Sequence, residues 1–359
     1  MSAGTPNYET NISFGGEMHL DVIIPTYNRA SMLSRTLESL LSAEPPPGLG
    51  VRITVVDNNS KDATREVVED YARRLSDRVT YVFEGRQGRS FALNAGITST
   101  SGDLVGMVDD DEQIDAGWYS SIHSVFAKRE IDFIGGPYMP QWGAEPPEWL
   151  PMSCVGAIGW IDGGSEIVPF DASYPGILMG GNAVLTRRIL NAVGLYDTRL
   201  GRSGSRLLSG EDEDMYKRLL AAGARGLYMP NLIIHHYIPP ERLTKSYFRR
   251  WSFWRGVSAG LIDRVRRTPV AYLAGVPRYM LGNAARGLYG AAAGLLLRTA
   301  DPSRSFGDEL EVWDAAGFFY GKHFYRTGEP AKSKTDRGTH TSPRLTDPDL
   351  RQDLSRSAE

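Results

Sequence analysis

The chain has 359 residues, 41% of them hydrophobic and 23% charged, which suits a large folded core and excludes a generally disordered protein. A formal net charge of −3 argues against a general nucleic-acid binder, and a single cysteine, Cys154, excludes an internal disulfide and fits a reducing, cytoplasmic setting. Neither a secretory signal nor an uninterrupted apolar run of about 18 residues is present, so we expect a globular protein without a membrane span.

The first 135 residues alternate short apolar runs with helical patterns. In chain order, the predicted elements are strand 20–25, helix 30–41, strand 51–57, helix 62–75, strand 79–83, helix 90–97 and strand 104–109. This alternation indicates βαβ units on a mostly parallel sheet. Because ligands of such sheets bind beyond the carboxyl ends of the strands, the polar residues after each strand are the first candidates for a site.

The rest of the chain is less regular. Residues 136–180 are rich in Pro, Gly and Trp and predict a binding loop that uses its aromatic side chains, Trp142, Trp149 and Trp160. Two strand and helix segments follow within 177–230, and residues 240–263 and 269–297 look helical, the latter as one or two helices separated near Pro277. We expect a flexible N-terminus (1–17), an α/β domain (18–238), a helical region (239–326) and a disordered tail (327–359).

Polar motifs follow the first two predicted strands. IIPTYNR, residues 23–29, has about even odds of being an ordinary strand-to-helix turn. VVDNNSKD ends the second strand with Asp57. An acid at this point of an α/β sheet commonly accepts hydrogen bonds from a nucleotide, so Asp57 is a candidate nucleotide ligand.

Four acids, Asp109, Asp110, Asp111 and Glu112, follow the fourth predicted strand. Acidic runs are most often solvated loops, but at the carboxyl edge of a sheet their mutual repulsion would be costly without a cation. Mg²⁺ and Mn²⁺ prefer oxygen ligands and leave positions for phosphate oxygens. In an extended segment Asp109 and Asp111 would project from the same side of the backbone, so the run predicts a metal and diphosphate site.

Two later motifs carry candidate catalytic groups. Glu211 and Asp212 begin a predicted helix, where the helix dipole alone favours acids. A carboxylate held at that position can also point into a cleft and act as a general base. His235 and His236 follow an apolar run, and either is a candidate metal ligand.

Taken in order, PTYNR, VVDNNSKD, SFALNAGI, VDDDE, GGNAVLTRR, GEDED and HHYIPPERLT resemble the family 2 glycosyltransferases of bacterial type. The resemblance covers about residues 18–260. It implies a GT-A fold, a Rossmann-like mostly parallel sheet flanked by helices, here with a C-terminal helical extension. Residues 18–135 would form the nucleotide-binding half and residues 136–238 the acceptor and catalytic half.

The resemblance also implies a reaction. The enzyme would be a glycosyltransferase of the hexosyltransferase type, moving a sugar with inversion from a nucleotide-diphospho-sugar to an acceptor hydroxyl in cell-surface polysaccharide or glycolipid assembly. UDP is the commonest nucleotide in the family, while GDP and dTDP stay open. Processive members carry a QxxRW-type motif, whereas this chain has YFRRW at 247–251, which favours a non-processive enzyme.

Site roles follow from the same resemblance. Asp111 would be a direct ligand of Mg²⁺ or Mn²⁺, together with Asp109 and His236, with His235 as the alternative. Asp212 would be the general base and Glu211 would lie close to the acceptor, while Glu112 would be a supporting group. The nucleotide sugar would be bound by Pro25, Tyr27, Arg29, Asp57, Asn94, Asp109, Asp110, Gly181 and Asn182.

The helical region is basic and aromatic. Residues 240–298 contain 11 Lys or Arg and two acids, so 11 minus 2 gives a local charge of +9. Such a surface suits peripheral contact with the anionic inner face of the cytoplasmic membrane, where a lipid-linked or other carbohydrate acceptor would be presented. The alternative is that these helices cover the sheet and their arginines are solvated.

Two other classes of protein use similar parts. A non-catalytic nucleotide-sugar or polysaccharide-binding protein on this fold would be expected to lack Asp212 or the acids at 109–111, and both are present. A nucleotidyltransferase would want a Gly-rich phosphate loop after the first strand, whereas PTYNRASM contains no glycine. A nucleotide-sugar donor and a carbohydrate or lipid-linked acceptor, with no nucleic acid, are therefore the expected partners.

Overall fold

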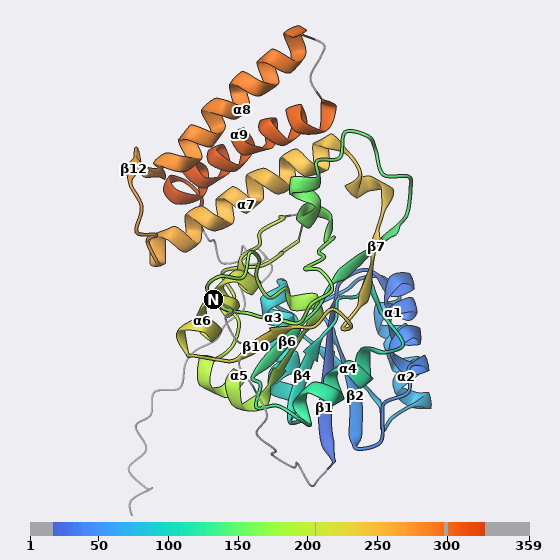
Figure 1. Ribbon diagram of the computed structural model, residues 1–359. Coiled ribbons are helices and arrows are strands. Elements are labelled where there is room, and N and C mark those ends of the chain that lie inside the picture. Colours follow the sequence, from blue (N-terminus) through green and yellow to red (C-terminus); the bar gives the residue numbers. More distant parts are fainter. Residues whose placement is uncertain (1–16, 205, 298–300, 327–359) are drawn as a thin grey trace, which may run out of the picture. The chain divides into compact units, whose positions relative to one another are not determined.

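The computed structural model describes residues 17–204, 206–297 and 301–326. The predictions of a flexible N-terminus and a disordered tail therefore fall almost wholly outside the described residues. Residues 17–325 belong to one compact unit, which holds both the main sheet and the C-terminal helices (Figure 1).

The first half of the chain alternates strands and helices as predicted. Strand β1 pairs in parallel with β2 and β4, and β2 pairs in parallel with β3. The βαβ prediction is confirmed for this part of the sheet. The elements are β1 (Met18–Thr26), α1 (Ala30–Ser42), β2 (Leu49–Asp57), α2 (Thr64–Arg74), β3 (Val79–Phe83), α3 (Arg89–Ser99) and β4 (Leu104–Met107).

The second half completes a mixed eight-stranded sheet of order β3-β2-β1-β4-β9-β6-β10-β8, in which β9 runs antiparallel to β4 and β6. A second sheet of order β5-β11-β7 sets β5, which begins at Glu112, beside the histidines of β11. The elements are β5 (Glu112–Ile114), α4 (Trp118–Phe126), β6 (Phe133–Gly135), β7 (Tyr138–Trp142), η1 (Met152–Ile158), β8 (Val168–Pro169), η2 (Gly180–Asn182), β9 (Ala183–Thr186), α5 (Arg187–Val193), α6 (Glu211–Ala221), β10 (Gly226–Tyr228) and β11 (Ile234–Ile238).

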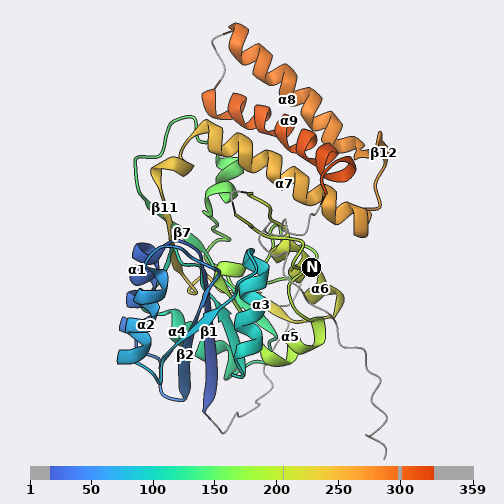
Figure 2. The same ribbon diagram turned by 180° about the vertical axis from the view of Figure 1, so that it is seen from behind.

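Helices cover both faces of the main sheet, as the views from front and back show (Figures 1 and 2). Successive side chains of a strand point to opposite faces, so Val22 and Ile24 of β1 join one core while Ile23 joins the other. The first core includes apolar residues of α1, α2 and α4, and the second those of α3, α5 and α6. This doubly covered sheet is the predicted GT-A type of architecture.

The C-terminal region is helical, as predicted, but it contains a short hairpin and a helix at Pro302–His323 that the sequence analysis did not single out. The hairpin of β12 and β13 ends at Pro277, and a single helix, α8, begins at the next residue. No described helix is long and apolar enough to cross a membrane. The elements are η3 (Pro240–Arg242), α7 (Lys245–Val265), β12 (Tyr272–Leu273), β13 (Val276–Pro277), α8 (Arg278–Leu297) and α9 (Pro302–His323).

The 136–180 segment holds these helices to the sheet domain. The Trp149 ring lies 5.6 Å from that of Phe248 in α7 and 5.1 Å from that of Phe306 in α9. Trp142 and Trp160 stack edge to face on each other at 5.7 Å. The three tryptophans of this segment therefore make packing contacts within the protein, while its Gly156, Ala157 and Gly159 line a cavity at the carboxyl edge of the sheet, as a binding loop would.

The local charge of +9 is partly compensated within the fold. Arg249 pairs with Glu309 at 2.5 Å, Arg255 with Asp314 at 2.8 Å, and Arg266 with Asp214 at 3.2 Å. The partners on α9 lie about 60 residues further along the chain, so the count over 240–298 excluded them. The exposed surface of this region is accordingly less basic than its sequence suggests.

Candidate active site

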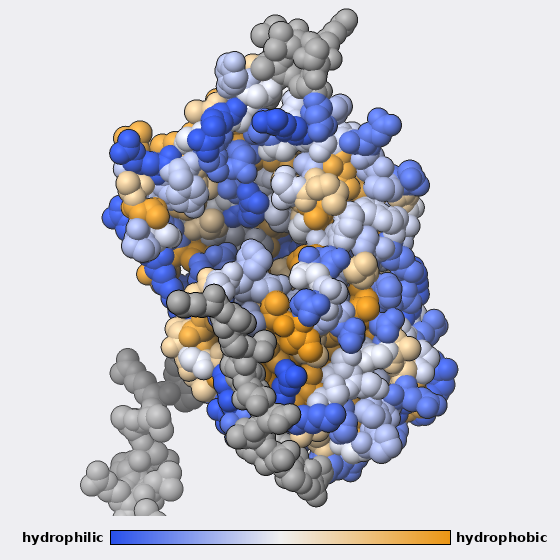
Figure 3. Space-filling view, viewed as in Figure 1, coloured by the Kyte–Doolittle hydropathy of each residue, from blue (hydrophilic) through white to orange (hydrophobic). Residues whose placement is uncertain are grey.

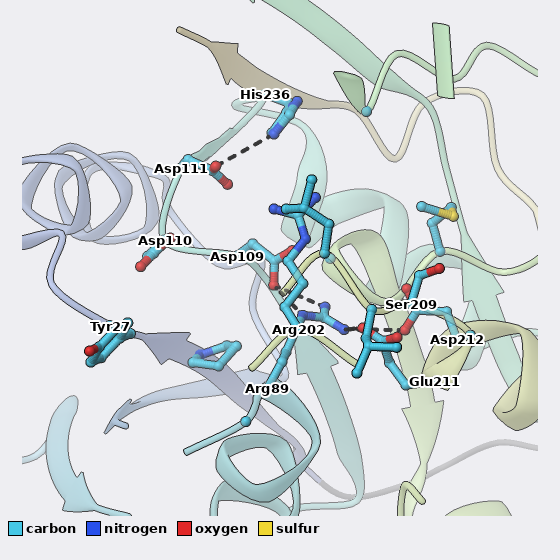
Figure 4. Close-up of a pocket in the computed structure, with 18 of the residues that line it drawn as sticks. Tyr27, Arg89, Asp109, Asp110, Asp111, Arg202, Ser209, Glu211, Asp212 and His236 are labelled. Carbon is cyan, nitrogen blue, oxygen red and sulfur yellow. Dashed lines mark hydrogen bonds and ion pairs between the residues drawn. The ribbon is translucent and has the colours of Figure 1, made fainter. Parts of the chain in front are cut away.

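A cavity of about 580 Å³ lies at the carboxyl edge of the main sheet. It brings together the ends of β1 and β4, the start of α3, the loop before α6, the start of α6, and β11. The acids that follow β4 lie on one side of it, those of α6 on the other, and two arginines lie between them (Figure 4). Of the predicted residues, the cavity is lined by Pro25, Tyr27, Arg29, Asp109, Asp110, Asp111, Gly181, Glu211, Asp212 and His236.

The acidic run forms a tight turn and not the extended segment that we expected. Strand β4 ends at Met107, and the Glu112 amide donates a hydrogen bond to the Asp109 carbonyl oxygen at 3.2 Å. Asp109 and Asp111 consequently reach different partners: Asp109 meets Arg89 at 2.9 Å, and Asp111 meets Arg242 at 3.0 Å. The expectation that both carboxylates project from one side of a strand is therefore wrong.

Cations compensate Asp110 and Asp111 inside the cavity wall. One guanidinium nitrogen of Arg29 lies 2.8 Å from a carboxylate oxygen of each, and Thr26 also donates to Asp110 at 2.8 Å. The Nε2 atom of His236 lies 3.6 Å from Asp111. Asp110 and Asp111 are both buried, so these contacts offset a large cost of desolvation.

The three acids differ in protonation because their neighbours differ. Burial raises the pKa of Asp110 to about 6, against the opposing effect of Arg29. Burial acts on Asp111 as well, but His236, Arg242 and Arg29 outweigh it and hold the pKa of Asp111 well below its usual value. Burial, together with Asp109 and Asp111, raises the pKa of Glu112 well above its usual value. Asp111 is thus the member of the three that stays ionised most firmly.

Asp212 and Glu211 begin α6 on the opposite side of the cavity. Arg89 lies 3.3 Å from a carboxylate oxygen of each, and it also holds Asp109. Burial and the charge of Asp212 raise the pKa of Glu211 to about 7, and one Glu211 oxygen has no hydrogen-bond partner among the described residues. Asp212 is less buried than Glu211, with 15% of its side chain exposed against 7%.

Two glycines leave room for these carboxylates. A Cβ atom on Gly180 would lie 2.2 Å from Oδ1 of Asp212, and one on Gly181 would lie 2.5 Å from Oε1 of Glu112. Such distances are far inside van der Waals contact, so any larger residue would displace the carboxylate. The structure therefore gives the glycines of the GGN sequence a steric role beside the cavity.

The neighbouring histidines are separated by strand alternation. His236 is 6% exposed and lines the cavity, whereas His235 points to the other face of β11, 4.0 Å from Asp115. Only His236 lies beside Asp111. Of the two alternatives for a ligand, it is the one that faces the acids.

The residues can be tested for their fit to a divalent cation. Asp111 and His236 offer an oxygen and a nitrogen 3.6 Å apart on the cavity wall, close enough for both to ligate one ion. Asp109 is turned toward Arg89, and the described residues hold no group of three acids, histidines or cysteines arranged for a metal. Arg242 contacts both Asp111 and His236 at 3.0 Å, so a cation held by this pair would displace that guanidinium and take its remaining ligands from elsewhere, such as phosphate oxygens.

Three predicted residues are not among those that line the cavity. Asp57 is buried and accepts hydrogen bonds from the Ser60 amide at 2.8 Å and the Tyr81 hydroxyl at 2.9 Å. Asn94 exchanges two hydrogen bonds of 2.9 Å with the backbone of Tyr196.

Asn182 is fully buried and is bonded to the Trp118 indole and to two backbone carbonyl oxygens. In the structure these three side chains hold the protein together beside the site, and Asn58, next to Asp57, lines the cavity instead.

The sequence analysis missed several arginines. Arg89 follows Gly88 at the start of α3, after the loop that begins where β3 ends at Phe83, so the rule that polar residues after a strand form the site could have identified it. Arg242 was counted with the surface charges, yet it is 8% exposed and contacts both Asp111 and His236 at 3.0 Å. Arg202 and Arg206 also line the cavity, and no motif distinguished them in the sequence.

Comparison with known proteins agrees with this picture. The family model described as "Glycosyl transferase family 2" matches residues 21–194. The glucosyl-dolichyl phosphate glucuronosyltransferase of Haloferax volcanii is 26% identical over 252 residues, which are 68% of this chain and 78% of that protein. The succinoglycan biosynthesis protein ExoM of Rhizobium meliloti is 24% identical over 251 residues, 68% of this chain and 74% of the relative.

Among solved structures, the mannosyltransferase PcManGT of Pyrobaculum calidifontis, in complex with GDP-Man and Mn²⁺, is similar with a TM-score of 0.58 at 17% identity. The match covers 88% of this chain and 90% of that one, and it supports the fold. The mostly parallel sheet, the acids after β4 and the match of residues 21–194 to glycosyl transferase family 2 lead to one conclusion: the chain is a glycosyltransferase with the GT-A fold.

Proposed function

We propose that this enzyme transfers a sugar from a nucleotide-diphospho-sugar, UDP-linked by family preference, to an acceptor hydroxyl with inversion, in the synthesis of a polysaccharide or glycolipid. The observation that carries the proposal is that Asp212 lines the same cavity as Asp109 and Asp111, from the opposite side. A donor bound along the acids after β4 would thus present its sugar toward Asp212.

Asp212 suits the role of general base. It lies in the first turn of α6, where the helix dipole favours an acid, and Arg89 contacts its carboxylate at 3.3 Å. We infer that Asp212 accepts the proton of the acceptor hydroxyl while that oxygen attacks the anomeric carbon and the nucleoside diphosphate leaves. One displacement inverts the configuration and needs no covalent intermediate.

Asp111 and His236 would hold Mg²⁺ or Mn²⁺, and Asp109 would need to exchange its contact with Arg89 to join them. A bound divalent cation supplies Lewis-acid neutralisation of the leaving diphosphate. Pro25 and Tyr27, at the end of β1, would line the nucleoside part of the site, with Arg29 anchoring Asp110 and Asp111.

Two alternatives make different predictions. A non-catalytic binder would take up nucleotide sugars and release no nucleoside diphosphate. A nucleotidyltransferase would consume a nucleoside triphosphate and a sugar phosphate and release pyrophosphate.

A screen distinguishes these possibilities. UDP-, GDP- and dTDP-sugars are added with Mn²⁺, and both thermal stabilisation and nucleoside diphosphate release are measured. We expect one class of donor to stabilise the protein and to be slowly hydrolysed. Binding without release in the presence of acceptor sugars, or pyrophosphate release from a triphosphate, would contradict the proposal. For the active donor, the anomeric configuration of the product tests inversion.

We also propose peripheral contact with an anionic membrane through α8. Tyr279 and Tyr289 are 59% and 78% exposed and lie on the same side of the helix as Arg286. Exposed aromatic side chains beside arginines suit the interface of an anionic bilayer. Figure 3 shows hydrophobic and hydrophilic side chains side by side over the C-terminal helices.

Flotation with anionic and neutral liposomes at low salt tests this contact. We expect the protein to float with anionic liposomes and the Y279S/Y289S variant to float less. The control is Phe83→Ser, which removes an exposed aromatic residue from the sheet domain. Absence of the wild-type protein from the anionic liposome fraction would contradict membrane contact.

A further inference from the structure

Two cavity arginines form no ion pair with a carboxylate of the described residues. Arg29, Arg89, Arg242 and Arg255 each pair with at least one acid. Arg202 makes no side-chain hydrogen bond or ion pair with any described residue, and Arg206 contacts only the neutral Tyr325, whose hydroxyl lies 3.2 Å away. Arg202 acts on Glu211 through its charge but forms no ion pair with it, so among the described residues the donor groups of Arg202 and Arg206 are not taken up by a carboxylate and are available to an anionic ligand.

The loop that carries both arginines is held at its two ends. The Arg89 amide donates to the Arg202 carbonyl oxygen at 2.9 Å, and the Ser209 amide donates to Oγ of Ser258 at 2.9 Å. Between these points, an antiparallel bridge joins Ser203 to Arg206. Arg202 and Arg206 therefore flank one tight turn on the wall of the cavity (Figure 4 labels Arg202).

Tyr325, which is buried, contacts Arg206 and also lies near exposed aromatic side chains of α9. Tyr325, which contacts Arg206, lies 6.1 Å from Tyr320, and Phe324 lies 5.7 Å from Phe319 and 6.4 Å from Tyr320 between ring centres. We call Phe319, Tyr320 and Phe324 the α9 aromatic patch; their exposed fractions are 41%, 41% and 61%. Arg206, on the cavity wall, is thus linked through Tyr325 to an exposed aromatic surface of α9.

We propose that Arg202 and Arg206 bind the phosphate groups of a polyprenyl-phosphate-linked acceptor, whose hydrocarbon chain lies on the α9 aromatic patch. Guanidinium groups bind phosphate through charge-assisted hydrogen bonds, and aromatic rings bury hydrocarbon chains favourably. This ligand rests on the proposed function, because it supplies the acceptor of that reaction. It is consistent with one relative whose name specifies a dolichyl phosphate substrate.

Farnesyl diphosphate is a soluble probe for this site. Binding to the full chain is measured by calorimetry after the donor site has been saturated with Mn²⁺ and whichever of UDP, GDP or dTDP binds. We expect the probe to bind the nucleotide-loaded protein, and R202Q/R206Q to weaken its binding by about tenfold or more. Phe324→Ser should weaken farnesyl diphosphate but not inorganic pyrophosphate, because only the former has a hydrocarbon chain.

Matched controls lie outside the site. Arg199→Gln removes a nearby arginine that pairs with Asp197. Phe83→Ser removes an exposed aromatic residue at the end of β3, which is not part of the α9 aromatic patch. Both variants should bind the probe as the wild type does.

Several results would overturn the proposal. Unchanged binding of the probe by R202Q/R206Q, or equal affinities for farnesol and farnesyl diphosphate, would contradict the proposed contact between these arginines and phosphate. Loss of probe binding when the nucleotide is present would assign the arginines to the donor's diphosphate. A change of oligomeric state in Phe324→Ser would assign the patch to self-association. The proposed function fails separately, if no nucleoside diphosphate binds or no sugar is transferred.

Discussion

The Arg89 guanidinium lies 3.3 Å from the Asp212 carboxylate and connects it to the acids on the far side of the cavity. Arg89 is the first residue of α3, and its own backbone amide is bonded to the loop before α6. One cation therefore links the two groups of acids that the proposed reaction requires, and it holds them close together against their mutual repulsion.

Replacing Arg89 by methionine should destabilise the protein strongly. The substitution keeps the length of the side chain but leaves Asp109, Glu211 and Asp212 without their shared cation. Removing one partner of a buried ion pair typically costs about 3–5 kcal/mol of unfolding free energy. Urea denaturation measures this cost. Arg65→Met, which breaks an exposed pair with Glu69, is the control, and equal midpoints for the two variants would refute the role of Arg89.

Glu211 should make the stability depend on pH. Its pKa is raised from 4.5 to about 7, mainly by burial, so its neutral form stabilises the fold fully below about pH 4.5. This contribution is lost as the pH rises through about 7, when the buried group ionises. Glu211→Gln stays neutral throughout, so its advantage in unfolding free energy over the wild type should grow with pH.

The difference in unfolding free energy between Glu211→Gln and the wild type should increase by more than about 1 kcal/mol between roughly pH 5 and pH 8, since one pKa unit corresponds to about 1.4 kcal/mol. Denaturation of both proteins at these values measures it. Glu213→Gln removes an exposed acid from the same helix turn and should give a difference that does not vary with pH. If the difference in unfolding free energy between Glu211→Gln and the wild type also did not vary with pH, the raised pKa of Glu211 would be excluded.

Gly180→Ala should impair catalysis by displacing the base. The added Cβ would lie 2.2 Å from Oδ1 of Asp212, so that the carboxylate must move by about 1 Å. A misplacement of this size costs roughly 10²-fold in rate. The measurement is kcat, with circular dichroism to confirm folding. Gly282→Ala in α8, where a Cβ meets only the end of the Arg286 side chain at 3.8 Å, should keep full activity.

His236 and His235 offer a matched test of the metal site. EDTA should abolish transfer, and Mg²⁺ or Mn²⁺ should restore it. His236→Ala should raise the Mn²⁺ concentration for half-maximal activity by about 10–100-fold, a typical effect of disturbing a metal site. His235→Ala should leave it unchanged, because that side chain points away from the cavity. Full activity of the wild type in EDTA would show that the cavity's arginines suffice without a metal.

The order of the strands and the positions of the main acids could be predicted from local patterns. Alternating apolar runs specify the βαβ units, and the carboxyl ends of β1 and β4 necessarily meet at one edge of the sheet. The choice between His235 and His236 required the pairing of β11 with β5, because strand alternation alone does not say which face is inside.

The contacts of the cavity's charged groups could not be predicted in this way. Asp109 turns toward Arg89 because the acidic run forms a turn, and Arg242 reaches Asp111 from 131 residues away. Asn94 and Asn182 match family motifs, but backbone groups and, for Asn182, the Trp118 indole take up their hydrogen-bonding capacity. Such pairings depend on which segments the fold brings together.

The most direct test of the account is the activity of Asp212→Asn with the donor identified by the screen. We predict that transfer falls by about 10²–10⁴-fold, the usual contribution of a general base, while the affinity for the donor stays within a few-fold of the wild type. The control is Asp214→Asn, which removes an acid of the same helix that pairs with Arg218. Transfer by Asp212→Asn at the wild-type rate, with donor binding intact, would contradict the assignment of Asp212 as the base.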